Sequence, residues 1–179
     1  MNDVSKVESG KNVAKRAEKK RITIERTFQA PLEDVWELWT TAEGIESWWG
    51  PDGFTTKVFK LDLWPGGELH YAMTATAAPQ IEFMKKAGMP LTNHTRGHYD
   101  EIVPMSRLAF TQIADFVPGV AAYEVETLVE LFPGAKGVRL VLTFDAMHDE
   151  QWTQMAKMGW ESEVDKLGRA LAARRAAQK

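Results

Sequence analysis

The chain of 179 residues contains no cysteine. Disulfides, thiolate metal sites and a cysteine nucleophile are therefore excluded, and the composition is compatible with a reducing cytoplasm. No stretch approaches the ~18 apolar residues that a membrane-spanning helix needs, and the first residues lack the apolar core of a signal peptide. We therefore expect a soluble cytoplasmic protein that does not associate with membranes.

Sequence signatures of catalysis are also missing. There is no GxSxG motif, no phosphate-binding loop and no dinucleotide fingerprint, and no residue stands out as a nucleophile. The net charge of -3 argues against a nucleic-acid partner for the protein as a whole. We expect no bound cofactor and no metal, and the sequence favours a non-enzymatic role while leaving enzymatic activity open.

The first 20 residues are basic and have almost nothing to bury, which is typical of a flexible, solvated tail. The remainder, residues 22–176, contains no linker that would divide it and is expected to form a single domain.

The last stretch of the chain, residues 149–176, predicts one long amphipathic helix. Apolar or small residues recur there at steps of three and four, which places them on one face of a helix. They are Trp152, Met155, Ala156, Gly159, Trp160, Val164, Leu167 and Leu171. At about 1.5 Å per residue the helix is ~40 Å long, so its apolar face needs an extended partner such as a curved sheet.

Seven segments between the tail and this helix have the alternation or the flanking turns typical of antiparallel strands. They cover residues 21–30, 55–63, 68–75, 95–103, 107–114, 123–132 and 138–145. Two short helices are predicted after the first strand, the first beginning at Pro31 and the second at Thr41. The pattern predicts an α+β helix-grip fold, in which a curved antiparallel sheet of about seven strands wraps around the long C-terminal helix.

One segment interrupts the succession of strands. Residues 76–94 form an insertion whose centre, residues 80–87, is weakly helical in pattern. An insertion of this length often has a function. Three interpretations remain open: a lid or wall of a pocket, a contact in a homodimer, or a plain excursion of the chain.

Several segments together resemble the START-like (SRPBCC) superfamily, in particular its branch similar to the activator of the heat-shock-protein ATPase. They are FQAPLEDVWELWTTAEGIESWWGP at 28–51, LDLWPGGELHYAM at 61–73, GHYDEIVPMSRLAFT at 97–111, GVRLVLTF at 137–144 and MGWESEVDKLGRAL at 158–171. The resemblance implies a cavity between the concave face of the sheet and the last helix, which the wider superfamily uses for lipids, sterols, polyketides and other hydrophobic molecules. It implies no particular reaction.

The candidate binding residues are mainly large apolar side chains expected to point inward from strands and helix or to lie near the entrance of the grip. They are Trp49, Phe54, Tyr71, Met73, Tyr99, Phe110, Met155 and Trp160. Each of them could equally serve the core alone.

Two histidines are the polar candidates. If their strands are neighbours, His70 and His98 could meet on one face and orient a ligand or act as acid and base. The plainer interpretation is that both face solvent. His94 and His98 have the spacing of two helical metal ligands, but the strand pattern there disfavours a metal site.

The leading functional hypothesis is therefore the binding of a hydrophobic or aromatic small molecule between sheet and helix. Two alternatives stay open: a co-chaperone-like domain that contacts a chaperone ATPase, and a cyclase- or hydrolase-type enzyme that uses His70 and His98.

Overall fold

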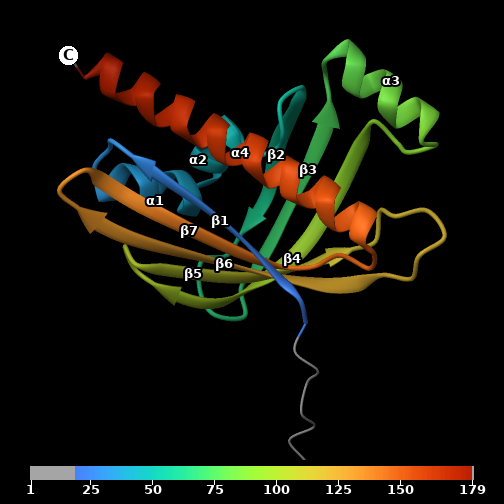
Figure 1. Cartoon of the computed structure of the whole chain (residues 1–179), viewed down its shortest axis with the longest axis horizontal. Helices are drawn as coiled ribbons and strands as arrows, with labels where there is room; N and C mark the ends of the chain where they lie inside the picture. The colour runs from blue at the N-terminus through green and yellow to red at the C-terminus, as the bar shows by residue number, and fades with distance from the viewer. Residues whose placement is uncertain (1–18, 179) are drawn as a thin grey trace, which may run out of the picture.

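The computed structural model describes residues 19–178, so the predicted tail lies, apart from Lys19 and Lys20, outside the described residues. The chain runs through seven strands and four helices (Figure 1). The strands are β1 (Arg21–Phe28), β2 (Phe54–Leu61), β3 (Glu68–Ala75), β4 (Thr92–Val103), β5 (Arg107–Ala114), β6 (Tyr123–Gly134) and β7 (Gly137–Asp145). The helices are α1 (Leu32–Thr40), α2 (Ala42–Trp48), α3 (Ala78–Lys86) and α4 (Glu150–Ala177).

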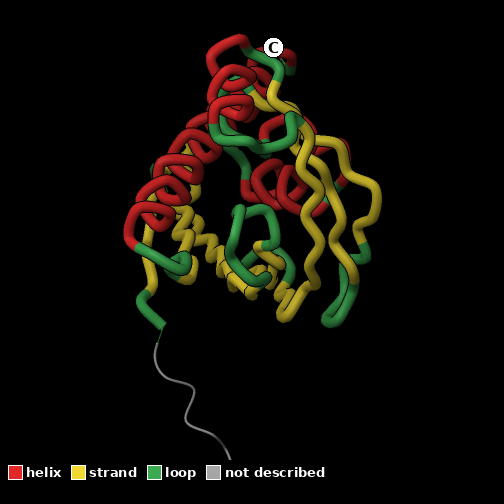
Figure 2. The backbone as a smooth tube through the Cα atoms, turned by 90° about the vertical axis from the view of Figure 1, so that its right-hand side faces the viewer, coloured by secondary structure: helices red, strands yellow, loops and turns green. Residues whose placement is uncertain are grey.

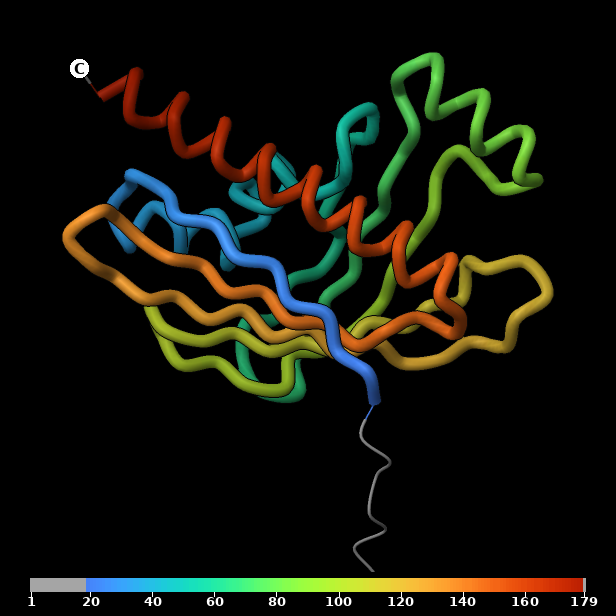
Figure 3. Tube along the Cα trace, viewed as in Figure 1, coloured from blue at the N-terminus to red at the C-terminus, as the bar shows by residue number. Residues whose placement is uncertain are grey.

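All seven strands belong to one antiparallel sheet with the order β1-β7-β6-β5-β4-β3-β2. Strands β2 to β7 form a continuous meander, and β1 joins its far edge beside β7, as the chain trace in Figure 3 shows. Viewed from the side, the sheet curls around the helices (Figure 2). The predicted helix-grip fold is confirmed.

The main difference from the expected boundaries lies at the insertion. Strand β4 begins at Thr92 rather than at residue 95, because Thr92, Asn93 and His94 continue the ladder opposite β3. The excursion between β3 and β4 is correspondingly shorter, and most of it is the helix α3.

Helix α4 begins where the side chain of Asp149 accepts a hydrogen bond from the backbone N–H of Trp152 at 2.8 Å, a standard N-terminal cap. Its buried face includes Val164, Leu167 and Leu171, as the apolar spacing predicts. Among residues 19–178, no helix is both long and apolar enough to cross a membrane.

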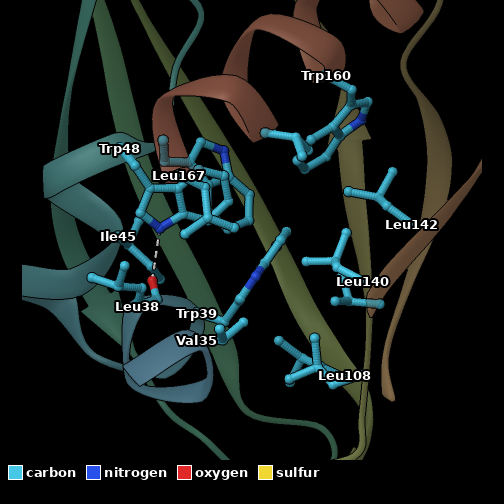
Figure 4. Close-up of a cluster of buried hydrophobic side chains, with 14 of the residues drawn as sticks. Val35, Leu38, Trp39, Ile45, Trp48, Leu108, Leu140, Leu142, Trp160 and Leu167 are labelled. Carbon is cyan, nitrogen blue, oxygen red and sulfur yellow. Dashed lines mark hydrogen bonds between the residues drawn. The ribbon is translucent and has the colours of Figure 1, made fainter. Parts of the chain in front are cut away.

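Indole rings from three helical segments meet beneath α4 (Figure 4). The ring centroids of Trp39 and Trp48 are 4.6 Å apart, and those of Trp49 and Trp160 are 5.6 Å apart. The Nε1 of Trp48 donates a hydrogen bond to the carbonyl of Leu38 at 2.8 Å, which satisfies its buried N–H group. The core therefore joins the two short helices to the long one.

The packing of α4 generates a stability prediction. Leu167 is fully buried, whereas Met158 on the same helix is 67% exposed. Leu167→Ala should lower the free energy of unfolding by ~2–5 kcal/mol, because it removes contacts and leaves a cavity. Met158→Ala should change it by less than ~0.5 kcal/mol. Urea unfolding followed by circular dichroism measures both, and equal effects of the two substitutions would contradict this account of the core.

Candidate ligand-binding cavity

A cavity of about 360 Å³ lies between the N-terminal half of α4 and the concave face of the sheet. The sheet contributes side chains from β3 to β7, among them Tyr71 and Phe144, and α4 contributes the face that carries Met155 and Trp160. Most of the lining side chains are apolar or aromatic. A size above ~300 Å³ and an apolar lining are typical of small-molecule sites.

The excursion between β3 and β4 supplies one wall of this cavity. Phe83 and Met84 of α3, and Met89 after it, are among the lining residues. Met84 is buried, whereas Phe83 is 50% exposed. The start of the excursion is fixed by backbone hydrogen bonds from Thr76 and Ala77 to the carbonyl of Gly53, at 2.8 and 3.2 Å. Of the three interpretations of this segment, its position fits that of a pocket wall.

The segment that leads from α2 to β2 forms another part of the lining and is held by α4. Lys166 donates hydrogen bonds to the carbonyl oxygens of Gly50 at 2.8 Å and Phe54 at 3.3 Å. Arg169 pairs with Asp52 at 2.6 Å. Gly50 has a φ of 97°, in the region that favours glycine, and this turns the chain sharply after Trp49. Helix α4 therefore fixes the position of this part of the cavity lining.

Glu163 is the most unusual residue of the cavity. It is 5% exposed, it lines the cavity, and its Oε1 accepts a hydrogen bond from the backbone N–H of Gly50 at 3.0 Å. Burial raises the pKa of Glu163 from 4.5 to about 8, against the opposing effects of the Gly50 N–H and the positive charge of Lys166. At neutral pH, this carboxyl group is therefore mainly protonated.

Further polar groups reach the cavity from the sheet. The amide of Gln112 donates a hydrogen bond to the hydroxyl of Tyr71 at 2.5 Å, and burial raises the pKa of Tyr71. Thr127 is fully buried, and its Oγ1 has no hydrogen-bond partner within the described part of the chain. An unpaired buried hydroxyl carries a desolvation cost that a ligand atom could remove.

The predicted apolar site residues fall into two groups. Those that line the cavity are Trp49, Phe54, Tyr71, Met73, Met155 and Trp160. Tyr99 and Phe110 instead lie in the core, with ring centroids 6.4 Å apart. The tryptophans at 48 and 49 are both buried, at 0% and 2% exposure.

The sequence left open a meeting of His70 with His98. The strands β3 and β4 are indeed neighbours, but the ring of His70 contacts that of His94. In the β3–β4 ladder, Glu68 lies opposite His98, and the Nε2 of His70 is 3.1 Å from the Nδ1 of His94 instead. Neither His70 nor His98 lines the cavity, because both alternate with inward-facing residues such as Tyr71 and so lie on the other face of the sheet. The plainer interpretation of both as outward-facing strand residues fits the structure. Within residues 19–178, no three potential ligand side chains gather as a metal site would require.

Two polar residues of the cavity, Glu163 and Gln112, are not among the predicted site residues, although the sequence pattern around each contains a signal. Glu163 follows Trp160 by three residues and precedes Leu167 by four, so an acid interrupts the apolar stripe of the helix. Gln112 continues the inward alternation of Leu108 and Phe110 on β5. Both are polar residues at positions where the pattern of the strand or helix predicts an inward-facing apolar side chain.

A seven-stranded sheet closed around a long terminal helix, with a cavity between them, defines a helix-grip protein. The family model described as Activator of Hsp90 ATPase homolog 1-like protein matches residues 29–172. The chain belongs to this family, which is a branch of the START-like (SRPBCC) superfamily, and the resemblance of its motifs is confirmed. No curated protein matches the chain.

Solved structures of similar fold come from several bacteria. A crystal structure of a Chromobacterium violaceum protein has a TM-score of 0.71 and 24% identity, over 84% of this chain and 96% of that one. The solution structure of an AHSA1-like protein from Aeromonas hydrophila has a TM-score of 0.65 and 23% sequence identity, over 87% of this chain and 94% of that one. The crystal structure of the AHSA1 protein from Silicibacter pomeroyi has a TM-score of 0.67 and 20% sequence identity, over 87% of this chain and 99% of that one. At these identities the likeness supports the fold alone.

The buried carboxyl group generates a prediction about pH and stability. Because the pKa of Glu163 is about 8 in the folded chain and near 4.5 when exposed, the folded state holds the proton more tightly. The contribution of Glu163 to the free energy of unfolding is largest at low pH. It decreases as pH rises from about 4.5 to about 8, by up to ~1.4 kcal/mol per pH unit.

The matched variant is Glu163→Gln, which keeps an oxygen for the Gly50 N–H but cannot ionise. Urea unfolding of both proteins at several pH values should show that the free energy of unfolding of the variant increases relative to that of the wild type as pH rises. Titrating groups that do not interact with Glu163 cancel in this difference, so parallel pH profiles would show that Glu163 is not a buried acid of raised pKa.

Proposed function

We propose that the protein binds a hydrophobic or aromatic small molecule in the cavity between the sheet and α4. The observation that carries this proposal is the cavity itself, about 360 Å³ in volume, with a lining that is largely apolar and aromatic. A well-packed core leaves few spaces larger than a water molecule. A space of this size therefore costs packing energy, and a ligand that fills it would recover that energy.

The glycines of α4 support the same conclusion. A Cβ atom added at Gly168 would lie 3.3 Å from the ring of Phe28, so helix and sheet are in close contact there. A Cβ added at Gly159, which lines the cavity, would have no atom within 4 Å. Because glycine weakens a helix interior by roughly 0.5–1 kcal/mol relative to alanine, its presence beside open space favours a role in leaving room for a ligand.

The fold and the family support, in general terms, either a ligand-binding or a co-chaperone-like domain. The cavity favours the first role. An enzymatic role that depends on His70 and His98 is not proposed, because both lie away from the cavity.

The test compares two substitutions of Gly159. Gly159→Phe should fill the cavity from α4 and weaken ligand binding by at least ~10-fold, which corresponds to ~1.4 kcal/mol. Gly159→Ala should leave binding intact and stabilise the helix by ~0.5–1 kcal/mol. Three cavity tryptophans, Trp49, Trp152 and Trp160, report binding by their fluorescence.

Lipids, flavonoids and small aromatic compounds form the ligand panel, with melting temperature as the second readout. The proposal expects at least one class to bind the wild type and the alanine variant but not the phenylalanine variant. A panel that never changes fluorescence or melting temperature, or binding that survives Gly159→Phe unchanged, would contradict it.

A further inference from the structure

Among the described residues that line the cavity, Glu163 is the only one with an acidic or basic side chain apart from Tyr71, whose hydroxyl stays neutral. These described residues therefore bring one carboxyl group and no cation to the cavity. A buried carboxyl group is expensive unless it is paired. A ligand with its own carboxylate or phosphate would find no positive partner among these lining residues.

Among residues 19–178, no neighbouring side chain forms an ion pair with Glu163, although the charge of Lys166 acts on it from further away. Lys166, one turn further along α4, directs its ammonium group to the carbonyl oxygens of Gly50 and Phe54 rather than to Glu163. Asp52 faces Arg169, and the remaining titratable neighbour is Tyr71 on β3. The single hydrogen bond of Glu163 to the Gly50 N–H could be made equally by a glutamine, so the loop does not require a carboxyl group.

Aromatic rings surround the same end of the cavity. Trp49 precedes Gly50, whose N–H binds Glu163, and Trp160 lies one helical turn before Glu163. The ring centroid of Trp49 is 5.6 Å from that of Trp160 and 5.5 Å from that of Tyr71. Ring faces attract organic cations, most strongly where water is excluded. A lone carboxyl group among such rings is complementary to a positively charged nitrogen.

We propose that the ligand is a hydrophobic amine, whose ammonium group pairs with the carboxylate of Glu163 while its apolar body occupies the cavity beneath α4. This inference rests on the proposed function, and it names the chemical class of the ligand. The amine brings the cation that the described lining residues lack, and the surrounding rings of Trp49, Tyr71 and Trp160 hold its charged end.

Binding of such an amine is linked to a proton. Because Glu163 is mainly protonated in the free protein below pH 8, an ammonium ion that pairs with its carboxylate displaces that proton. The affinity for an amine should then rise by nearly tenfold per pH unit from about pH 6 to about pH 8. A neutral ligand displaces no proton, so its affinity should stay level over that range.

Isothermal titration calorimetry with three probes of the same ring system tests the proposal on the full chain. The probes are naphthylmethylamine, naphthylmethanol and naphthoic acid. At pH 8 the amine should bind at least ~10-fold more tightly than the alcohol, with the acid weakest. Titrations at pH 7 in buffers of different ionisation enthalpy should show release of about one proton per amine and none per alcohol.

Glu163→Gln should abolish both the preference for the amine and its proton release, while Met158→Ala, at an exposed position of α4, should retain both. If the alcohol or the acid binds as tightly as the amine, or the amine releases no proton, the ligand class is wrong although the cavity still binds ligands. If none of the three probes binds, the ligand class is wrong, and the proposed function fails with it when the panel of lipids, flavonoids and small aromatic compounds does not bind either.

Discussion

The apolar face of α4 has to be covered along its length, and the curved sheet covers it in two different ways. Toward the C-terminal end the contact is tight, with Gly168 against Phe28 and Leu167 fully buried. Toward the N-terminal end the helix stands above open space at Gly159. The C-terminal half of α4 therefore packs in the core, and the N-terminal half lines the cavity. The stability of the fold and the proposed binding depend on the same helix.

The carboxyl group of Glu163 lies at the transition between these two halves. Its hydrogen bond to Gly50 and the neighbouring bonds of Lys166 fasten the segment that leads into β2, so the helix also sets one edge of the cavity. Burial of an acid destabilises the free protein at alkaline pH. A positively charged ligand would relieve that cost, which couples the loop, the helix and the ligand through one side chain.

Periodicity predicted most of the fold, because strands that alternate and a helix with one apolar face report which side is buried. It could not give the pairing register, so a meeting of His70 with His98 stayed open in the sequence, whereas the neighbour of His70 in the structure is His94. Nor could it separate core from cavity: Tyr71 lines the cavity and Tyr99 does not, although both point inward. That distinction depends on how far α4 stands from each strand, which no local pattern records. Glu163 and Gln112 could have been found as polar residues on inward faces.

The distribution of methionines offers the most direct measurement of ligand binding in the cavity. Wild-type protein labelled with ¹³C at the methionine methyl groups would be titrated with naphthylmethanol and followed by NMR. The methionines that line the cavity are Met73, Met84, Met89, Met147 and Met155, whereas Met105 and Met158 are exposed. We expect the methyl signals of the cavity set to shift together to saturation while those of Met105 and Met158 stay in place. Shifts confined to Met105 and Met158, or no shifts at all, would contradict a ligand-binding cavity beneath α4.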